Sequence, residues 1–168
     1  MGRLGAIWGL GGVLAVLAYA VVRLAGIFLE ALDYSFDWRH WAVLIVNTAF
    51  MAYTEGYRGF QQGYSPRVVA RAATLIEAPT GLRVALAPLF CMGYFHTTRR
   101  RLISVYVLTF GIVMLILLFQ LIPQPWRGIL DAGVVLGLSW GMASILAFAA
   151  KAWLGPGLVH SPDLPGYD

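Results

Sequence analysis

The stretch from Leu102 to Ile122 contains no charged side chain, and it is long enough to carry one helix across the hydrocarbon core of a bilayer. Three further runs are also long and apolar enough to span, although they carry one or two charges each, namely Leu4–Ala25, Trp41–Phe60 and Ile129–Ala150. Tryptophans lie near the ends of these runs, as is typical of the two membrane interfaces: Trp8, Trp38, Trp41, Trp126 and Trp153. We therefore predict an all-α, polytopic transmembrane bundle with four spanning helices.

The composition agrees with a membrane protein and excludes several other classes. Charged residues make up 12% of the chain, against about 25% in soluble domains. Cys91 is the single cysteine, so the chain forms no internal disulfide and no cysteine-based metal site. The basic residues are not arranged on a soluble surface, so we expect no nucleic-acid partner. We also expect no metal and no cofactor, because the sequence lacks the motifs that hold them.

A fifth apolar run, Leu82–His96, is short for a full crossing, since its length as a helix is about 22 Å. If it does not cross, nine basic residues share one side: Arg3, Arg58, Arg67, Arg71, Arg83, Arg99, Arg100, Arg101 and Lys151. Arg23, Arg39 and Arg127 then lie on the other side. If the run does cross, this bias almost disappears. The positive-inside rule therefore favours a re-entrant or interfacial segment, although flanking arginines can also adapt the bilayer to a fifth short helix.

This arrangement predicts a bacterial cytoplasmic membrane protein with both termini in the cytoplasm. Residues 1–153 form the membrane domain in this prediction. Residues 154–168 are rich in Gly and Pro and poor in apolar side chains, so we expect a flexible tail there.

The stretch from Tyr53 to Arg71 collects acidic, basic, amide and hydroxyl side chains in an otherwise apolar chain. Asn47, Glu55 and Arg58 recur at helical spacing and share one face of the second predicted span. With His96, which returns to the same side in the four-span arrangement, they are candidates for a polar patch that handles protons or anions. The alternative, which we favour, is a structural ion pair between Glu55 and Arg58 near the membrane interface.

The Ser65–Pro66 pair is typical of a helix start, because the Ser hydroxyl can cap free amides and Pro suits the first turn. The helix that follows carries Arg67 and Arg71 on one side and aliphatic residues on much of the rest. Such an amphipathic helix is expected at the headgroup boundary. We therefore expect contacts with anionic lipid headgroups from Arg67, Arg71, Arg99, Arg100 and Arg101.

Gly133, Gly137 and Gly141 are spaced four residues apart on the last predicted span. This pattern, a glycine zipper, lets the backbone of another helix approach closely. We favour packing inside the protein over a homodimer seam.

Three classes of function fit these features. The first is an accessory, assembly or structural membrane subunit that acts through helix packing and through contacts with lipids or a partner subunit. The second is a small proton or anion transporter or channel that uses Glu55 and Arg58. The third is a lipid-modifying membrane enzyme. We favour the first, and we expect no catalytic residues, because the acidic side chains are scattered along the chain and form no recognisable catalytic set.

Overall fold

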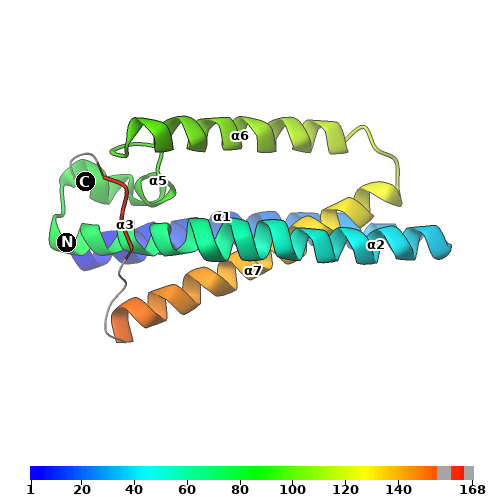
Figure 1. Cartoon of the computed structure of the whole chain (residues 1–168), viewed down its shortest axis with the longest axis horizontal. Coiled ribbons are helices and arrows are strands. Elements are labelled where there is room, and N and C mark those ends of the chain that lie inside the picture. The colour runs from blue at the N-terminus through cyan, green and yellow to red at the C-terminus, as the bar shows by residue number, and fades with distance from the viewer. Residues whose placement is uncertain (155–159, 165–168) are drawn as a thin grey trace.

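The computed structural model of the protein describes residues 1–154 and 160–164, and every regular element in these ranges is helical (Figure 1). In chain order the elements are α1 (Gly2–Ala31), α2 (Trp38–Met51), η1 (Ala52–Tyr64), α3 (Ser65–Glu77), α4 (Gly81–Ala85), α5 (Ala87–Met92), α6 (Arg99–Phe119) and α7 (Trp126–Leu154). The predicted all-α class is therefore confirmed for the described residues. Of the predicted flexible tail, residues 155–159 and 165–168 lie outside the described part.

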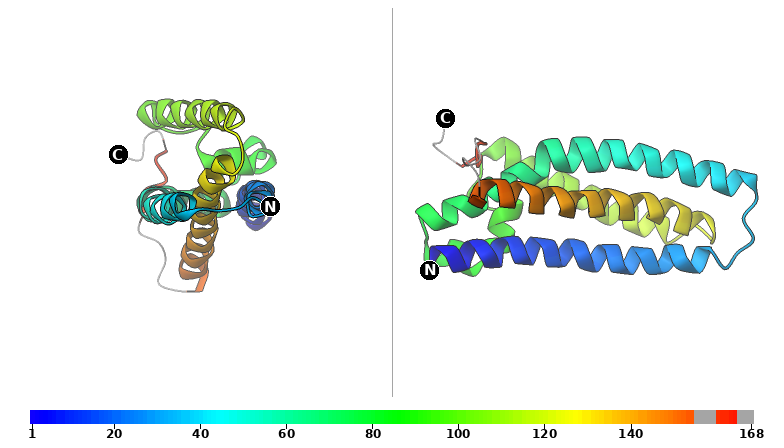
Figure 2. Two further views of the ribbon diagram at one scale, coloured as in Figure 1. Left: turned by 90° about the vertical axis from the view of Figure 1, so that its right-hand side faces the viewer. Right: turned by 90° about the horizontal axis from the view of Figure 1, so that it is seen from below.

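Three long rods lie side by side and form the body of the molecule (Figures 1 and 2). They are α1, α7 and a continuous helical rod in which α2, η1 and α3 follow one another without a break. Gly2 lies against the Leu75 carbonyl of α3, whereas Ala31 at the other end of α1 contacts Gly128 of α7. We call these two ends of the bundle the N-terminal end and the opposite end.

Three helices are long and apolar enough to cross a membrane, namely α1, α6 and α7. The second predicted span is not among them. Its α2 part has only 14 residues, and η1, which continues it, is rich in polar side chains. The described structure therefore supports a membrane protein with three such helices.

The apolar run predicted as re-entrant or as a fifth span folds into two short helices, α4 and α5. Both pack against the first half of α1, where Val84 lies at Gly5, Cys91 at Gly9 and Pro88 at Gly12. The chain then turns at Gly93, whose φ of 91° is readily adopted by glycine, and reaches the start of α6. Residues 81–98 thus leave and rejoin the bundle at its N-terminal end (Figure 1).

The helix predicted to be amphipathic and interfacial, α3, packs into the core of the bundle. Nine of the 13 residues of α3 are buried, because α1, α5 and α7 all pack around this helix. Val68 and Leu75 join Val13, Phe90 and Ile145 in one apolar cluster at the N-terminal end. Burial of this cluster anchors α3 within the bundle.

The α6 helix stands apart from the three rods (Figure 1). Val105 is its one buried residue, and nearly all its other large apolar side chains are exposed. A hydrogen bond of 2.7 Å between the Tyr94 and Thr109 hydroxyls ties its first half to the preceding loop. Such a helix is stable in a bilayer, where lipid replaces the missing protein neighbours.

Candidate functional site

The polar stretch singled out in the sequence forms η1, a π-helix of 13 residues. π-helices usually occur as single turns inside α-helices, frequently at functional sites. Because the hydrogen bonds of η1 join residues five apart, Glu55, Phe60 and Ser65 come to lie on one face. This face meets Gly137, Gly141 and Ser144 of α7.

The glycine zipper therefore packs inside the protein. Gly133 lies against the Asn47 and Met51 side chains, and a Cβ added at Gly137 would come within 2.6 Å of Glu55 Oε2. At Gly141 the ring of Phe60 takes the place that a side chain would need. The internal seam, which the sequence favoured over a homodimer, is the arrangement that the structure shows.

Glu55 lies near the middle of this seam. Its Oε2 atom is buried and has no hydrogen-bond partner among the described residues. The expected ion pair with Arg58 is not formed in the described part, where the two ion pairs join Asp37 to His40 and Arg127 to Asp131. The reason is the π-helical register, which leaves Arg58 exposed while Glu55 turns toward α7.

Other polar groups on the seam are satisfied by direct hydrogen bonds. Asn47 donates to the carbonyls of Ile129 and Leu130, at 2.9 and 3.2 Å. Trp140 Nε1 donates to Gln61 Oε1 at 2.8 Å. These bonds join the second rod to α7 along much of its length.

Ser65 does not cap a helix, so this prediction was wrong. The backbone is already helical at Tyr64, so the amides that follow it are not those of a free helix start. The Ser65 hydroxyl bonds instead to the Ser144 hydroxyl at 2.5 Å. Pro66 follows the point where the π-helical pattern ends, which is a natural position for a residue that cannot donate a backbone hydrogen bond.

Arg71 is the most enclosed charged group at the N-terminal end, with an exposed fraction of 3%. Its Nε donates to the Phe90 carbonyl at 2.6 Å, and its Nη2 donates to the carbonyls of Phe95 and His96. Its Nη1 reaches the Pro162 carbonyl at 2.9 Å, and the guanidinium stacks over the Phe90 ring. Burial lowers the pKa of Arg71 to about 10, which still leaves it charged at neutral pH.

Arg71 therefore does not fit the headgroup role predicted for it, because protein carbonyls take most of its donors. His96 does not join the seam either. Its side chain is exposed at the N-terminal end, and its backbone belongs to the loop that Arg71 holds. The predicted polar patch of Asn47, Glu55, Arg58 and His96 is thus dispersed, and Asn47 and Glu55 alone share the α7 seam.

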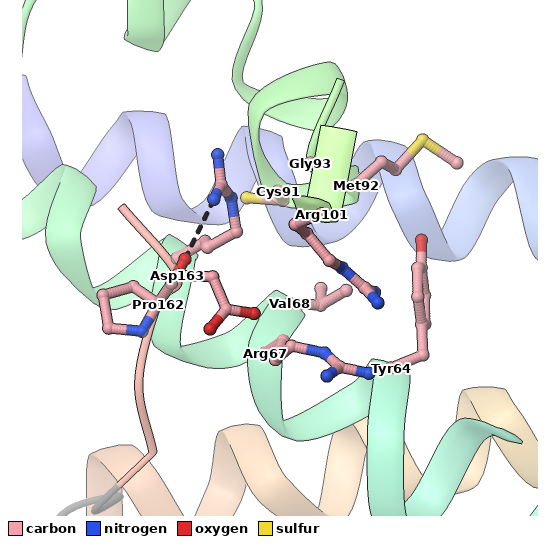
Figure 3. A pocket seen from close by; sticks show the side chains of 10 residues that line it. Tyr64, Arg67, Val68, Cys91, Met92, Gly93, Arg101, Pro162 and Asp163 are labelled. Atoms are coloured by element: carbon pink, nitrogen blue, oxygen red, sulfur yellow. Dashed lines mark hydrogen bonds between the residues drawn. The ribbon is translucent and has the colours of Figure 1, made fainter. Parts of the chain in front are cut away.

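Arg67 and Arg101 line a small cavity with Arg71, Tyr64 and Asp163 (Figure 3). Burial and the nearby Arg101 lower the pKa of Arg67. The Nε of Arg67 is buried without an acceptor among the described residues. Arg99 and Arg100, the other predicted headgroup candidates, are exposed at the start of α6.

The sequence analysis missed the role of the C-terminal segment. The Asp163 carbonyl accepts hydrogen bonds from the Thr98 amide and the Thr97 hydroxyl, at 3.2 and 3.0 Å. Pro162 and Leu164 are buried at the same place. Residues 160–164 are therefore docked on the bundle. No sequence pattern predicted this docking, because backbone carbonyls make most of the contacts.

No protein-family model, curated protein or solved structure matches the chain. Within the described ranges, no group of three or more His, Cys, Asp or Glu side chains is placed to hold a metal ion.

Proposed function

We propose that the protein is a four-span integral membrane protein that serves as an accessory or assembly subunit by binding a transmembrane helix of a partner. The observation that carries this proposal is an open groove of about 470 Å³ beside the second half of α7. It is lined by Ser139, Ala143 and Ala147, with Trp140, Phe148 and Gln61 at its sides.

The groove has the chemistry that transmembrane helices use to associate. Ser139, Ala143 and Ala147 are exposed and spaced four residues apart, so they form a small-residue ridge on the side of α7 not used by the glycine zipper. Small residues let two helix backbones approach closely, and a hydroxyl such as that of Ser139 can add a hydrogen bond. An apolar partner helix with small residues of its own fits this groove.

In this proposal, α1, the α2–η1 part of the second rod, α6 and α7 cross the membrane. The N-terminal end, with Arg99, Arg100 and Arg101, faces the cytoplasm, in a bacterial cytoplasmic membrane. The placement of α4 and α5 beside α1 supports a re-entrant segment, and the basic residues at this end agree with the positive-inside rule.

The test fills the groove and leaves the rest of α7 unchanged. Full-length protein carrying Ala143→Leu or Ala147→Leu is purified from native membranes in mild detergent, together with wild-type protein and Ala15→Leu. Ala15 is also an exposed helical alanine, but it lies on α1 and does not line the groove. We expect a stoichiometric partner with wild-type protein and Ala15→Leu, and its loss with the two groove variants.

Partner recovery that is equal in all four preparations, or a partner-free wild-type preparation, would contradict the proposal. If the retained partner is a second copy of the chain, the groove is a homodimer seam instead.

Glu55 supports a second candidate, a path for protons or small anions. A carboxylate within a span is costly unless it faces protein or water, and Glu55 Oε2 is buried without a partner in the described part. Proteoliposomes should then show a flux that Glu55→Gln abolishes and that Glu30→Gln, at an exposed position, leaves intact. A flux that survives Glu55→Gln in folded protein would remove this candidate.

A further inference from the structure

The small cavity at the N-terminal end holds more positive charge than the described residues neutralise. Arg67, Arg71 and Arg101 line it, and Asp163 is the one acidic side chain among its lining residues (Figure 3). The charge of Arg71 is met by four backbone carbonyls. No such compensation reaches the Nε of Arg67, which is buried and unbonded in the described part.

Asp163 does not complete the site by itself. Its carboxylate lies in the cavity, but the described residues form no ion pair between Asp163 and Arg67 or Arg101. A partly buried cation without a hydrogen-bonded counter-charge is unfavourable. The arrangement therefore favours an additional anion between Arg67 and Arg101.

The start of α6 adds to this preference. Arg101 lies in the first turn of α6, directly after Arg99 and Arg100, and Thr98 makes no side-chain hydrogen bond that caps the helix. The N-terminal end of a helix carries a partial positive charge, so cations there are disfavoured and an anion is stabilised. An anion beside Arg101 would relieve the repulsion between the guanidinium groups of Arg67 and Arg101, which line the same cavity.

We infer that Arg67 and Arg101 form a binding site for a phosphate group, and that the docked segment 160–164 closes this site when it is empty. A planar guanidinium can donate two parallel hydrogen bonds to phosphate, and two such groups in one cavity match its oxygens. The site does not depend on the groove beside α7, so the two proposals can fail separately.

The size of the cavity gives the docked segment its role. The space is about 10 Å³, room for about one water molecule, so a phosphate can enter only if Pro162 and Asp163 move aside. Asp163 holds a negative charge in the same place and therefore competes with the phosphate. Gly63 contributes as well, because an added Cβ would lie 3.0 Å from Arg67 Nη2 and restrict this guanidinium.

A phospholipid headgroup and free inorganic phosphate share this chemistry, and the test separates them. Full-length protein in neutral detergent is titrated with phosphatidylglycerol or phosphatidylcholine and analysed by native mass spectrometry. Inorganic phosphate is added in a parallel thermal-unfolding series. For a headgroup site we expect one retained phosphatidylglycerol per chain and weaker binding of phosphatidylcholine.

The variants locate the site. Arg67→Gln and Arg101→Gln should each weaken phosphatidylglycerol binding about tenfold, the effect of losing a charged hydrogen bond. Arg100→Gln removes the same charge at an exposed neighbouring position and should leave binding within about twofold of wild type. Asp163→Asn removes the competing charge and should strengthen binding.

Equal binding by wild type, Arg67→Gln, Arg101→Gln and Arg100→Gln would overturn the inference. If phosphate stabilises wild type but not Arg67→Gln, and phosphatidylglycerol is not retained, the phosphate site stands and its ligand is free phosphate. Should Arg67→Gln fail to fold, the Asp163→Asn variant provides the test. If its affinity for phosphatidylglycerol or phosphate is no higher than that of wild type, the docked segment does not compete for the site and the inference is wrong.

Discussion

Single polar side chains connect the helices at the N-terminal end of this bundle, and Arg71 is the clearest case. One guanidinium binds the carbonyls of Phe90, Phe95, His96 and Pro162, so it joins α3 to α5, to the following loop and to the docked segment. Loop carbonyls away from water need such a donor, because a buried unpaired carbonyl is costly. Arg71 therefore has a structural role that a residue facing lipid could not have.

Arg71→Lys tests this role. Lysine keeps the charge but cannot present several donors in one plane, so we expect a loss of about 3 kcal/mol in the free energy of unfolding. The measurement is denaturant unfolding in mixed micelles, with limited proteolysis to follow release of the docked segment. Arg100→Lys, at an exposed site, should change stability by less than about 0.5 kcal/mol. Equal stability of the two variants would disprove the structural role.

Asp37 gives the opposite end of the bundle a pH-dependent helix cap. Its carboxylate accepts hydrogen bonds from the Arg39 and His40 amides at 3.0 and 3.1 Å. The His40 amide is the main cause that lowers the pKa of Asp37 below its ordinary value. Because the folded-state pKa is depressed, the cap contributes stability above about pH 4, the unfolded value, and loses it as pH falls through the folded value.

We therefore expect the difference in unfolding midpoint between wild type and Asp37→Asn to narrow as the pH is lowered from 6 toward 3. Asparagine can also cap a helix, but it does not titrate. A difference that stays constant over this range would show that the Asp37 charge does not stabilise α2.

At the scale of elements, the contact between the second rod and α7 depends on two different repeats. The small residues of α7 recur every three or four positions, whereas their partners Glu55, Phe60 and Ser65 recur every five. The i→i+5 hydrogen bonds of a π-helix bring residues five apart nearer to one face than the α-helical period does. The close packing of this seam therefore needs both the π-helical η1 and the glycines of α7.

Gly137→Ala should disturb this seam. The new Cβ would lie 2.6 Å from Glu55 Oε2 and 3.0 Å from Glu55 Cδ, so the Glu55 side chain or the two rods must shift, at a cost of about 1–3 kcal/mol in unfolding free energy. Gly11→Ala is the matched control, because its Cβ meets nothing within 4 Å. It should raise stability by about 0.5–1 kcal/mol through helix propensity. Unfolding in mixed micelles measures both, and equal effects would contradict the close approach at Gly137.

At the scale of the whole molecule, the bundle gathers its basic loops at one end. α4, which carries Arg83, packs beside α1, and α6 begins at the same end of the bundle with Arg99 and Arg101. The α6 helix then runs to the opposite end with little contact to the other rods. This arrangement leaves large apolar surfaces that only lipid or other transmembrane helices can cover.

Thiol labelling tests how this bundle is threaded. In a Cys91→Ser background, an impermeant maleimide should label Thr80→Cys and Arg99→Cys from one side of the membrane and Ser35→Cys from the other. Ser35, Thr80 and Arg99 are all exposed, whereas Cys91 is buried. Labelling of Thr80→Cys and Arg99→Cys from opposite sides would establish that residues 81–98 cross the membrane, and four spans would then be wrong.

The sequence by itself determined the class of the molecule. Long uncharged runs must satisfy their backbone hydrogen bonds within helices, so an all-α membrane protein follows from composition and segment length. Gly133, Gly137 and Gly141 likewise marked a close helix contact, because their spacing is a property of α7 alone.

Only the tertiary structure decided which side chains meet. An α-helical period placed Arg58 beside Glu55, and the Ser65–Pro66 pair predicted a helix cap. The continuous helical backbone through η1 and into α3 overturned both predictions. The burial of Arg71 and the docking of residues 160–164 depend on carbonyls from segments far apart in the chain, and carbonyls are the same for every residue type. Local patterns report the period of one helix, whereas register between helices and backbone contacts are settled when the whole bundle packs.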